Sequence, residues 1–375
     1  MNKKNIIIIM IDGGRYDYAK NSDYFNKIKK QSVHFSQSIT YAPHTIAAMH
    51  AVFSGCYGSR TGTDSYWTTY NFNSDNFKTI TEYLKENDYF TQCDLINELI
   101  IPKQGFDVFS IHDENKDNLV ERHTKILENM KTINQTGKKF FLYLHYSNIH
   151  TGIKNEVLNV YHNHSEEFFE NIDTNKKRYT SLFKNAEQYL DLILNEIKKL
   201  ELDEDSLILI MSDHGVSTGE RFGENAYGAF CYDYTLKTMT YFLNSNFEPI
   251  EISQQIRLID FMPTILNILD ISLDSKFEKL DGCSLLPLFK KQKMDELTAI
   301  SQTGNPLKNK RPPEKPNVHS IRTSKWKLIY NQHDDTKELY DLSDDLTEKN
   351  NLISLNNEIE ETLWKELKQQ IKFNV

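Results

Sequence analysis

A threonine at the predicted start of a helix is the first candidate for chemistry. The segment from His44 to Gly55, HTIAAMHAVFSG, has good helix formers after Thr45 and ends in a glycine, as a helix with a glycine C-cap does. Free N–H groups and the helix dipole favour an anion at that end, so the Thr45 hydroxyl could ionise more easily there and lie beside a phosphate. Threonine is also a common N-cap. Thr45 is therefore either a nucleophile or a simple helix cap.

Carboxylate and imidazole groups follow two apolar runs, and these groups are candidates for binding a metal. Ser212-Asp213-His214-Gly215 comes directly after one run, and Asp12 comes after another. Mixed oxygen and nitrogen ligands suit a transition metal such as zinc or manganese. The alternatives are a chance Asp-His pair and a turn-forming Asp12 before two glycines.

A third polar segment, YSNIHTG, contains Asn148 and His150. His150 could donate to a substrate oxygen or act as a general acid. His145 still belongs to the preceding apolar run, so we predict that its side chain points into the core or a helix layer. An isolated histidine can also have a purely structural role.

Three apolar, β-rich runs are typical of buried parallel strands, and they must position these groups. The runs are Asn5 to Ile11, Lys139 to His145, and Leu207 to Met211. A helical pattern over Asn185 to Leu200 lies between strand candidates. Such alternation predicts an α/β fold with a mainly parallel sheet covered on both sides. Ligands of such sheets gather beyond the carboxyl ends of the strands, where the three polar segments lie.

The texture of the sequence changes after about Lys290. Gly304-Asn305-Pro306 and Arg311-Pro312-Pro313 punctuate a polar stretch that predicts a loop or linker. A short strand over 326–330 and a final amphipathic helix follow. The helix residues predicted to point inward are Ile359, Leu363, Trp364, Leu367 and Ile371. We therefore predict a catalytic domain over 1–290, and a linker with a small C-terminal α+β subdomain over 291–375.

Composition narrows the partners and the compartment. The net charge is −9 and no long Lys/Arg block stands out, so nucleic acid is not an expected partner. The four cysteines are scattered, which favours a reducing compartment. The first apolar run is too short for a signal-peptide core, and no run approaches the ~20 apolar residues of a membrane span. We predict a cytoplasmic protein without a membrane span.

Together these segments resemble the sulfatase family of the alkaline phosphatase superfamily, and the resemblance extends along nearly the whole chain. IIIIMIDGGRYD is similar to the family's strand and metal-binding turn, TIAAMHAVFSG to its nucleophile helix, and YLHYSNIHTG to its substrate-binding histidine segment. MSDHG resembles the second metal segment, and IRTSKWKLIY with ELYDLSDDLTEKNNL the C-terminal subdomain. The resemblance implies an alkaline-phosphatase-like α/β/α sandwich.

Several departures from the family pattern bear on the reaction. Active sulfatases carry a cysteine or serine that is oxidised to formylglycine, followed by an arginine, where this chain has Thr45 and Met49. The paired aspartates are reduced to Asp12-Gly13. The Gly-Lys-Trp-His segment is replaced around 93–98, and the lysine expected near 229–231 has no clear counterpart. These departures argue against sulfate ester hydrolysis.

The remaining constellation is similar to the one-metal site of lipoteichoic-acid synthases and phosphoethanolamine transferases, which use a threonine nucleophile. It implies one divalent ion (Mn, Zn, Ca or Mg), a phosphothreonine intermediate, and a small-molecule or glycan phosphate ester as substrate, either a phosphomonoester or a phosphodiester. The implied metal ligands are Asp12, Thr45, Asp213 and His214. The implied catalytic residues are Thr45 and His150, with substrate bound by His150, Asn148 and His319. Three alternatives stay open: a two-metal site that also uses His145, His150 and His319; a divergent sulfatase that cleaves sulfate esters; and a non-catalytic relative that binds an anionic glycan.

Overall fold

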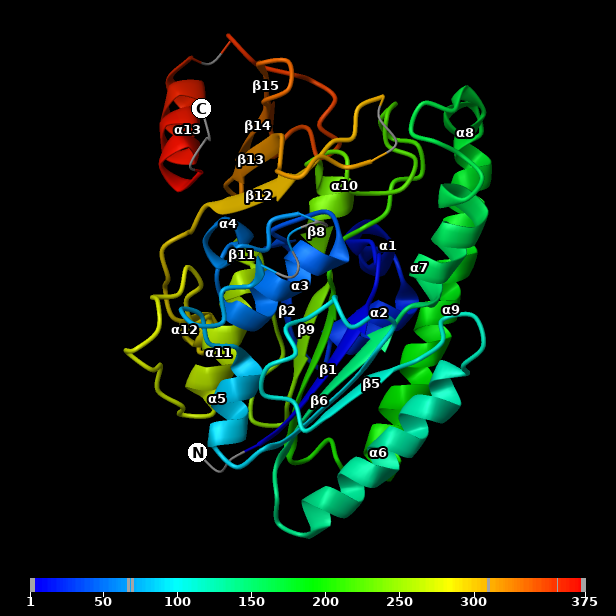
Figure 1. Cartoon of the computed structure of the whole chain (residues 1–375), viewed down its shortest axis with the longest axis vertical. Coiled ribbons are helices and arrows are strands. Elements are labelled where there is room, and N and C mark those ends of the chain that lie inside the picture. The colour runs from blue at the N-terminus through cyan, green and yellow to red at the C-terminus, as the bar shows by residue number, and fades with distance from the viewer. Residues whose placement is uncertain (1–3, 66–67, 69–70, 309–310, 356, 372–375) are drawn as a thin grey trace.

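An eight-stranded sheet forms the centre of the protein (Figure 1). The computed structural model describes residues 4–65, 68, 71–308, 311–355 and 357–371. The strand order is β10-β2-β9-β7-β1-β6-β4-β5, and only β9 runs antiparallel to its two neighbours. The strands are β1 (Asn5–Ile11), β2 (Val33–Phe35), β4 (Phe90–Leu95), β5 (Val108–Ile111), β6 (Phe140–Tyr146), β7 (Ser206–Ser212), β9 (Thr240–Leu243) and β10 (Ile250–Ile252).

The three strands predicted from apolar runs are β1, β6 and β7, and they are neighbours at the middle of the sheet. β1 pairs in parallel with both of the others. Its side chains alternate between the two faces, with Ile6, Ile8 and Met10 in one core cluster and Ile7 and Ile9 in the other. A strand buried on both faces has no polar positions to alternate with, which explains its uniform sequence.

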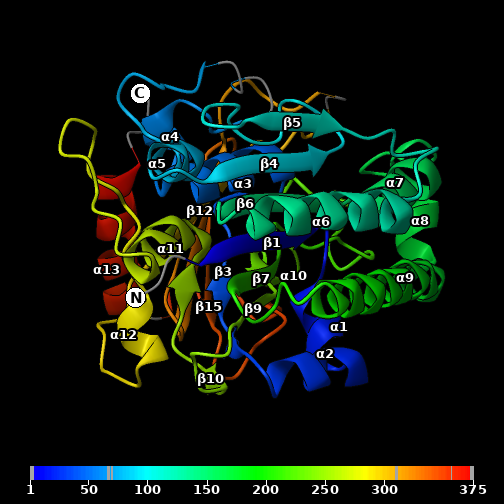
Figure 2. The same ribbon diagram turned by 90° about the horizontal axis from the view of Figure 1, so that it is seen from below.

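Helices cover both faces of the sheet, so the predicted α/β/α sandwich is confirmed (Figure 2). One face is covered by α3 (Thr45–Ser54), α5 (Ile80–Glu86), α11 (Phe261–Ile268) and α12 (Leu286–Phe289). The other face is covered by α1 (Tyr16–Lys20), α2 (Asp23–Lys29), α6 (Leu119–Gln135) and α9 (Ile172–Lys199). α9 begins earlier than predicted, because Tyr179 and Phe183 continue its buried stripe towards the N-terminus.

Shorter elements lie around the carboxyl edge of the sheet and its flanks. They are α4 (Gly58–Thr61), α7 (Asn148–Ile153), the π-helical turn η2 (Lys154–Leu158), α8 (Glu166–Glu170), α10 (Asp233–Leu236) and the 3-10 turn η3 (Leu258–Asp260). A second small sheet has the order β11-β3-β8, formed by Ile256–Arg257, Ser38–Ile39 and Lys237–Thr238.

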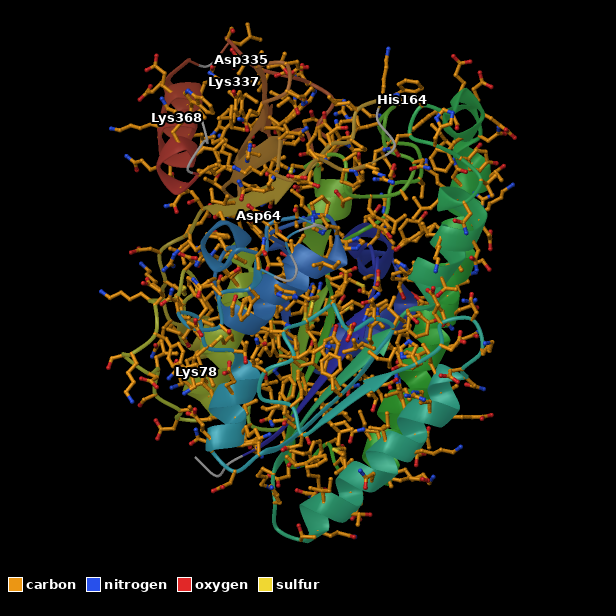
Figure 3. The ribbon with its side chains drawn as sticks, in the orientation of Figure 1. Asp64, Lys78, His164, Asp335, Lys337 and Lys368 are labelled. Atoms are coloured by element: carbon orange, nitrogen blue, oxygen red, sulfur yellow. The ribbon has the colours of Figure 1, made fainter. Side chains whose placement is uncertain are left out.

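The C-terminal region contains an antiparallel sheet that the sequence predicted only in part. Its order is β12-β13-β14-β15, with α13 packed against it. The elements are β12 (Ala299–Thr303), β13 (Val318–Arg322), β14 (Trp326–Asn331), β15 (Thr336–Asp341) and α13 (Asn357–Gln370). The predicted strand over 326–330 and the inward face of α13 are confirmed, because Leu363 and Leu367 are buried beneath the sheet. Lys337 and Lys368, labelled in Figure 3, lie over the Trp364 ring and shield its outer side.

The prediction of a linker immediately after Lys290 is wrong for β12, which lies inside that stretch. β12 is polar in sequence yet fully buried, because its polar groups bond to the segment before α3. The Ser301 hydroxyl donates to the carbonyl of Thr40 at 2.6 Å, and the Gln302 N–H donates to the carbonyl of Tyr41 at 2.8 Å. Residues 309 and 310 of the predicted linker lie outside the described residues. The described helices include none that is long and apolar enough to cross a membrane.

Candidate active site

The order of the central strands brings Asp12 and the Asp213-His214 pair together. Asp12 follows β1 and Asp213 follows β7, and these two strands are direct parallel neighbours. The turns are locked to each other, because the Gly13 N–H donates to Asp213 Oδ1 at 3.1 Å. Gly13 has a φ of +72°, a conformation that most other residues adopt only with strain. The pairing of β1 with β7 therefore places two predicted metal ligands, Asp12 and Asp213, next to each other at the carboxyl edge of the sheet.

Thr45 is the first residue of α3, and its hydroxyl points at this pair. Thr45 Oγ1 lies 3.4 Å from Asp12 Oδ2 and 3.3 Å from His214 Nε2. The N-cap is His44, in an extended conformation, so Thr45 is not a capping residue. α3 ends at Gly55 in the left-handed conformation, as predicted. The structure thus brings the predicted nucleophile and the three predicted protein ligands to one place.

The donor set fits a divalent cation. Ligand atoms of Asp12, Asp213 and His214 all lie within 4.8 Å of one another. Within the described part of the chain, Asp12 Oδ1 and Asp213 Oδ2 are buried and have no hydrogen-bond partner, which is costly for carboxylate oxygens unless a cation binds them. His214 Nδ1 lies 2.8 Å from the carbonyl of Gly215, so this nitrogen carries the proton and Nε2 keeps its lone pair for a metal.

The two carboxylates have opposite electrostatics. Burial alone would raise the pKa of Asp12, but His150, His145 and His214 together hold it well below its usual value. Burial raises the pKa of Asp213, and the negative charge of Asp12 raises it further. Two buried acids that repel each other are a common feature of cation sites, because the ion removes the repulsion.

The predicted burial of His145 is confirmed, but its contact with the site was missed. Its side chain is fully buried, and its Nε2 lies 3.0 Å from Asp12 Oδ2. The two faces of a wholly apolar strand cannot be told apart from sequence, and His145 lies at the end of β6 where the strand meets the site. His145 therefore orients the Asp12 carboxylate.

His150 approaches the same carboxylate from α7 and faces the open side. Its Nδ1 lies 3.7 Å from Asp12 Oδ2 and 3.3 Å from the Tyr227 hydroxyl. The His150 side chain is 21% exposed, whereas those of His145 and His214 are fully buried. Of these three histidines, only His150 can meet a substrate from solvent.

Sequence reasoning missed Tyr227, whose ring lies 4.7 Å from the ring of His214. It belongs to the irregular segment between His214 and α10, near the region where the family lysine was sought. A tyrosine in a loop gives no periodic signal, so only the structure could place it. Its hydroxyl lies 3.3 Å from Nδ1 of His150.

Two other predicted substrate residues lie apart from this contact set. Asn148 is exposed as the first residue of α7. His319 lies on β13, where Gln302 and Gln332 hydrogen-bond to its two ring nitrogens at 2.8 and 3.1 Å. It lines a pocket of about 660 Å³ between α4 and the C-terminal sheet. Substrate binding by Asn148 and His319 stays a prediction.

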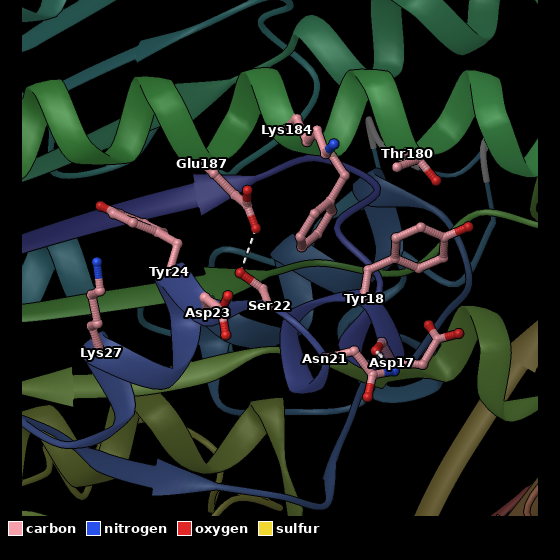
Figure 4. A pocket seen from close by; sticks show the side chains of 11 residues that line it. Asp17, Tyr18, Asn21, Ser22, Asp23, Tyr24, Lys27, Thr180, Lys184 and Glu187 are labelled. Carbon is pink, nitrogen blue, oxygen red and sulfur yellow. Dashed lines mark hydrogen bonds between the residues drawn. The ribbon is translucent and has the colours of Figure 1, made fainter.

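A further pocket, of about 640 Å³, lies between α1, α2 and α9 (Figure 4). The Ser22 hydroxyl donates to Glu187 across it, and Asp17, Tyr18 and Lys184 line its walls. None of the proposed metal ligands lines this pocket. It is a surface groove separate from the carboxyl edge.

Comparisons with known proteins agree with this fold. The Sulfatase family model matches residues 4–271, and a model described as N-sulphoglucosamine sulphohydrolase, C-terminal, matches residues 230–373. The chain therefore belongs to the sulfatase family, whose members are ester hydrolases that typically bind a divalent metal. No curated protein matches it.

Solved structures show the same fold at low sequence identity. A protein in complex with its substrate D-glucosamine-2-N,6-O-disulfate has a TM-score of 0.73 at 18% identity, covering 100% of this chain and 99% of that one. A 2-O glycosaminoglycan sulfatase has a TM-score of 0.78 at 16% identity, covering 98% and 92%. A phosphonate monoester hydrolase of Agrobacterium radiobacter has a TM-score of 0.75 at 12% identity, covering 98% and 95%.

Proposed function

We propose that this protein is a metal-dependent enzyme that cleaves or transfers a phosphate ester through a Thr45 nucleophile. One observation carries the proposal: the Thr45 hydroxyl lies within 3.4 Å of both Asp12 and His214, beside two carboxylate oxygens that lack partners among the described residues. A site for binding alone has no need of a hydroxyl aimed at three potential ligands of one ion. This argues against a purely glycan-binding relative.

Different residues of the site would bind the metal ion, attack the ester and donate a proton. Asp12, Asp213, His214 and Thr45 would hold the ion, which would lower the pKa of the Thr45 hydroxyl and neutralise charge on the ester. The Thr45 hydroxyl would lose its proton to solvent, and its Oγ1 would then form a bond to phosphorus while the bond from phosphorus to the leaving oxygen breaks. His150, the partly exposed histidine beside Asp12, would donate a proton to that oxygen. Water or an acceptor alcohol would then attack the phosphorus of the phosphothreonine, and the bond from phosphorus to Thr45 Oγ1 would break.

The charges around the site favour a substrate with one negative charge. In the described structure, the ion pairs of Asp12 and Asp213 all involve histidines. Arg15 follows closely in sequence, but Glu220 and Asp17 neutralise it. Met49, at the position of the family arginine, is fully buried in the core. A phosphomonoester carries up to about two negative charges at pH 7, so we favour a phosphodiester over a monoester.

Sulfate ester hydrolysis is the second candidate, and the comparisons support it. Both family models and a glycosaminoglycan sulfatase structure point to sulfated glycans as substrates of relatives. A sulfate monoester also carries a single negative charge, so the charge argument does not exclude it. Thr45 argues against it, because threonine cannot be oxidised to formylglycine. We propose a glycan or small-molecule ester as substrate, in the cytoplasm.

The test compares matched esters on one protein. Purified protein is stripped with EDTA, reloaded in turn with Mn²⁺, Zn²⁺, Ca²⁺ or Mg²⁺, and given para-nitrophenyl phosphate, bis(para-nitrophenyl) phosphate or para-nitrophenyl sulfate. We expect the diester to be cleaved fastest, Thr45→Ala to lose at least about 10³-fold in kcat, and Thr45→Ser to keep measurable activity. Acid-quenched wild type should carry a phosphoryl adduct on the peptide that contains Thr45. Faster cleavage of the sulfate ester would favour the second candidate, and full activity in Thr45→Ala would exclude the nucleophile.

A further inference from the structure

A second buried cluster lies beside the active site, on the neighbouring strands of the sheet. Asp94 is the last residue but one of β4, His112 follows β5, and Ser147 follows β6. His112 Nδ1 lies 2.9 Å from Asp94 Oδ2, and His112 Nε2 lies 3.0 Å from the Ser147 hydroxyl. The side chains of Asp94 and His112 are fully buried, and Ser147 has no exposed surface. The three residues form one continuous hydrogen-bonded chain.

The bonding around Asp94 fixes the direction of that chain. Arg122 donates to both carboxylate oxygens at 2.7 to 3.0 Å, and His123 Nε2 lies 3.1 Å from Oδ2. Burial would raise the pKa of Asp94, but hydrogen bonds from His112, His123 and Arg122 hold it well below its usual value. His112 therefore donates from Nδ1 to an ionised carboxylate, and its Nε2 accepts from the Ser147 hydroxyl.

The composition of the cluster, Asp94 with His112 and His123, could also suit a metal ion. Its bonding speaks against that. His123 Nδ1 lies 2.6 Å from the Tyr189 hydroxyl, and the cluster leaves no buried polar atom without a partner, unlike Asp12 and Asp213. Arg122 already supplies the positive charge that an ion would bring. The cluster is complete without an ion.

The helix α7 begins where this chain of bonds ends. Ser147 occupies the N-cap position of α7, but its side chain makes no capping hydrogen bond. The side-chain oxygen of a serine at that position ordinarily accepts a hydrogen bond from a backbone N–H of the first turn, and here the hydroxyl is directed to His112 instead. Only the Ser147 carbonyl serves the helix, accepting from the Thr151 N–H at 2.9 Å. The hydroxyl therefore anchors the start of α7 to β5.

A second anchor comes from the same segment after β5. Glu114, two residues beyond His112, accepts a hydrogen bond from the Thr151 hydroxyl at 3.0 Å and forms an ion pair with Lys154. His150 lies between the two anchored positions, and its own contacts to Tyr227 and Asp12 are the longer ones of 3.3 and 3.7 Å. The position of His150 therefore depends on how α7 is held.

We propose that Asp94, His112 and Ser147 are positioning residues for the reaction, because they fix the first turn of α7 and so aim His150 at the scissile ester. This inference rests on the proposed function for the role of His150. The placement of α7 itself does not depend on any reaction. A failure of this positioning inference can therefore be told apart from a failure of the proposed function.

Two single variants break the same hydrogen bond from its two ends. His112→Asn keeps a donor for Asp94 and loses the acceptor for Ser147, and Ser147→Ala removes the hydroxyl. The first substrate is a phenyl phosphate ester, which has a poor leaving group. With it, each variant should lower kcat about tenfold with little change in KM, because a small displacement of a catalytic group reduces the rate by about that factor. With a nitrophenyl ester, whose leaving group needs no proton, the loss should be smaller. The double variant should be no worse than either single variant.

A double-mutant cycle separates positioning from general destabilisation. If Ser147 acts through His150, Ser147→Ala should cause no further loss in a His150→Ala background. The matched control is His34→Asn, on β2 towards the other edge of the sheet. His34 is buried, bonds to the Thr240 carbonyl at 3.1 Å and stacks on Tyr241. It should lose stability without changing the ratio of the two esters.

Hydrogen exchange tests the same inference without turnover. Amides over 147–153 should exchange faster in His112→Asn and Ser147→Ala than in wild type, and they should be unchanged in His34→Asn. Unchanged exchange there together with unchanged kcat would overturn the proposal. So would a second bound ion in wild type that His112→Asn loses, since the cluster would then be a metal site. If wild type cleaves no ester but the exchange result holds, the proposed function fails and the anchoring of α7 stands.

Discussion

The Thr45 hydroxyl oxygen lies 3.3 Å from Nε2 of His214, although 169 positions separate the two residues in the sequence. The contact joins the first turn of α3 to the carboxyl end of β7. Helix and strand therefore meet at the edge where parallel sheets place their ligands. We propose that this hydroxyl and the Nε2 lone pair of His214 are ligands of the same cation.

Asp213→Asn should abolish tight binding of a divalent ion while preserving the local backbone. The asparagine oxygen can still accept from the N–H groups of Gly13 and His214, which now bond to Asp213 Oδ1. Only the charge and the second oxygen are lost, so affinity should fall by at least about 100-fold. Isothermal titration of EDTA-stripped protein with Mn²⁺ and Zn²⁺ measures it. Asp64→Asn, in the separate pocket that His319 lines, serves as the control. Equal affinity in Asp213→Asn would place the ion elsewhere.

The same substitution should stabilise the metal-free protein. Burial and the charge of Asp12 raise the pKa of Asp213, so its ionised form opposes folding when no ion is present. A neutral asparagine removes that opposition, and we expect a gain on the order of 1 kcal/mol in the free energy of unfolding at pH 7. Adding ion should then raise the Tm of wild type and leave that of Asp213→Asn unchanged. A lower Tm for metal-free Asp213→Asn would contradict the electrostatic account.

The central fold could be predicted because its strands are buried on both faces. Asn5–Ile11 matches its predicted range, and β6 and β7 differ from theirs by one residue at each end. Uninterrupted apolar runs have few other structures available to them. β12 and β13 were missed because their buried polar residues, such as Ser301 and His319, are satisfied only by partners distant in sequence.

The candidate site was predictable to the extent that its residues follow strands. Asp12, Asp213 and His214 each come immediately after a recognisable run, and the structure brings all three together with Thr45. Tyr227 could not be found, because a loop has no period that fixes its position. The Asp94–His112 pair was missed for another reason. Asp94 lies inside β4, and the role of a charged residue within a strand cannot be predicted until its buried partners are known.

Glu224→Gln should stabilise the protein at alkaline pH and not at acidic pH. Glu224 is fully buried, and burial raises its pKa to about 7, although Tyr234 and the N–H groups of Phe230 and Ala229 bond to it. The pKa of Glu224 is higher in the folded state than in the unfolded state. The contribution of Glu224 to the free energy of unfolding is therefore most favourable below about pH 4.5 and falls as the pH rises towards 7. Glutamine removes this penalty, which is roughly 3 kcal/mol at most.

Urea unfolding of wild type and Glu224→Gln at pH 5, 6, 7 and 8 measures the effect. The difference in the free energy of unfolding should grow from pH 5 to pH 8 in favour of the variant. Glutamine keeps an oxygen for the two N–H groups and offers its amide to the Tyr234 hydroxyl, so the fold should persist. A difference that is the same at every pH would show that Glu224 is ionised in the folded state.

Asp233→Asn should destabilise the contact between α10 and the C-terminal antiparallel sheet. Asp233 starts α10 and is paired with two cations of the C-terminal sheet, Arg322 and Lys327, each at 2.9 Å. Lys327 is fully buried and also pairs with Glu348 at 2.7 Å. The hydrogen bonds of Asp233 to Arg322 and Lys327 join α10 to the C-terminal sheet. Removing one acid leaves a buried excess positive charge, which costs about 3–5 kcal/mol.

Chemical denaturation of Asp233→Asn checks this value, and Glu248→Gln is the matched control because its ion pair with Lys291 is exposed on both sides. Solvent screens an exposed ion pair, so the control should unfold almost as wild type does. Adding Lys327→Met to Asp233→Asn removes the excess charge and should restore part of the loss, since an apolar side chain can replace a buried ion pair at little cost. If the double variant is less stable than Asp233→Asn, Lys327 stabilises the contact between α10 and the C-terminal sheet by packing and not by its charge.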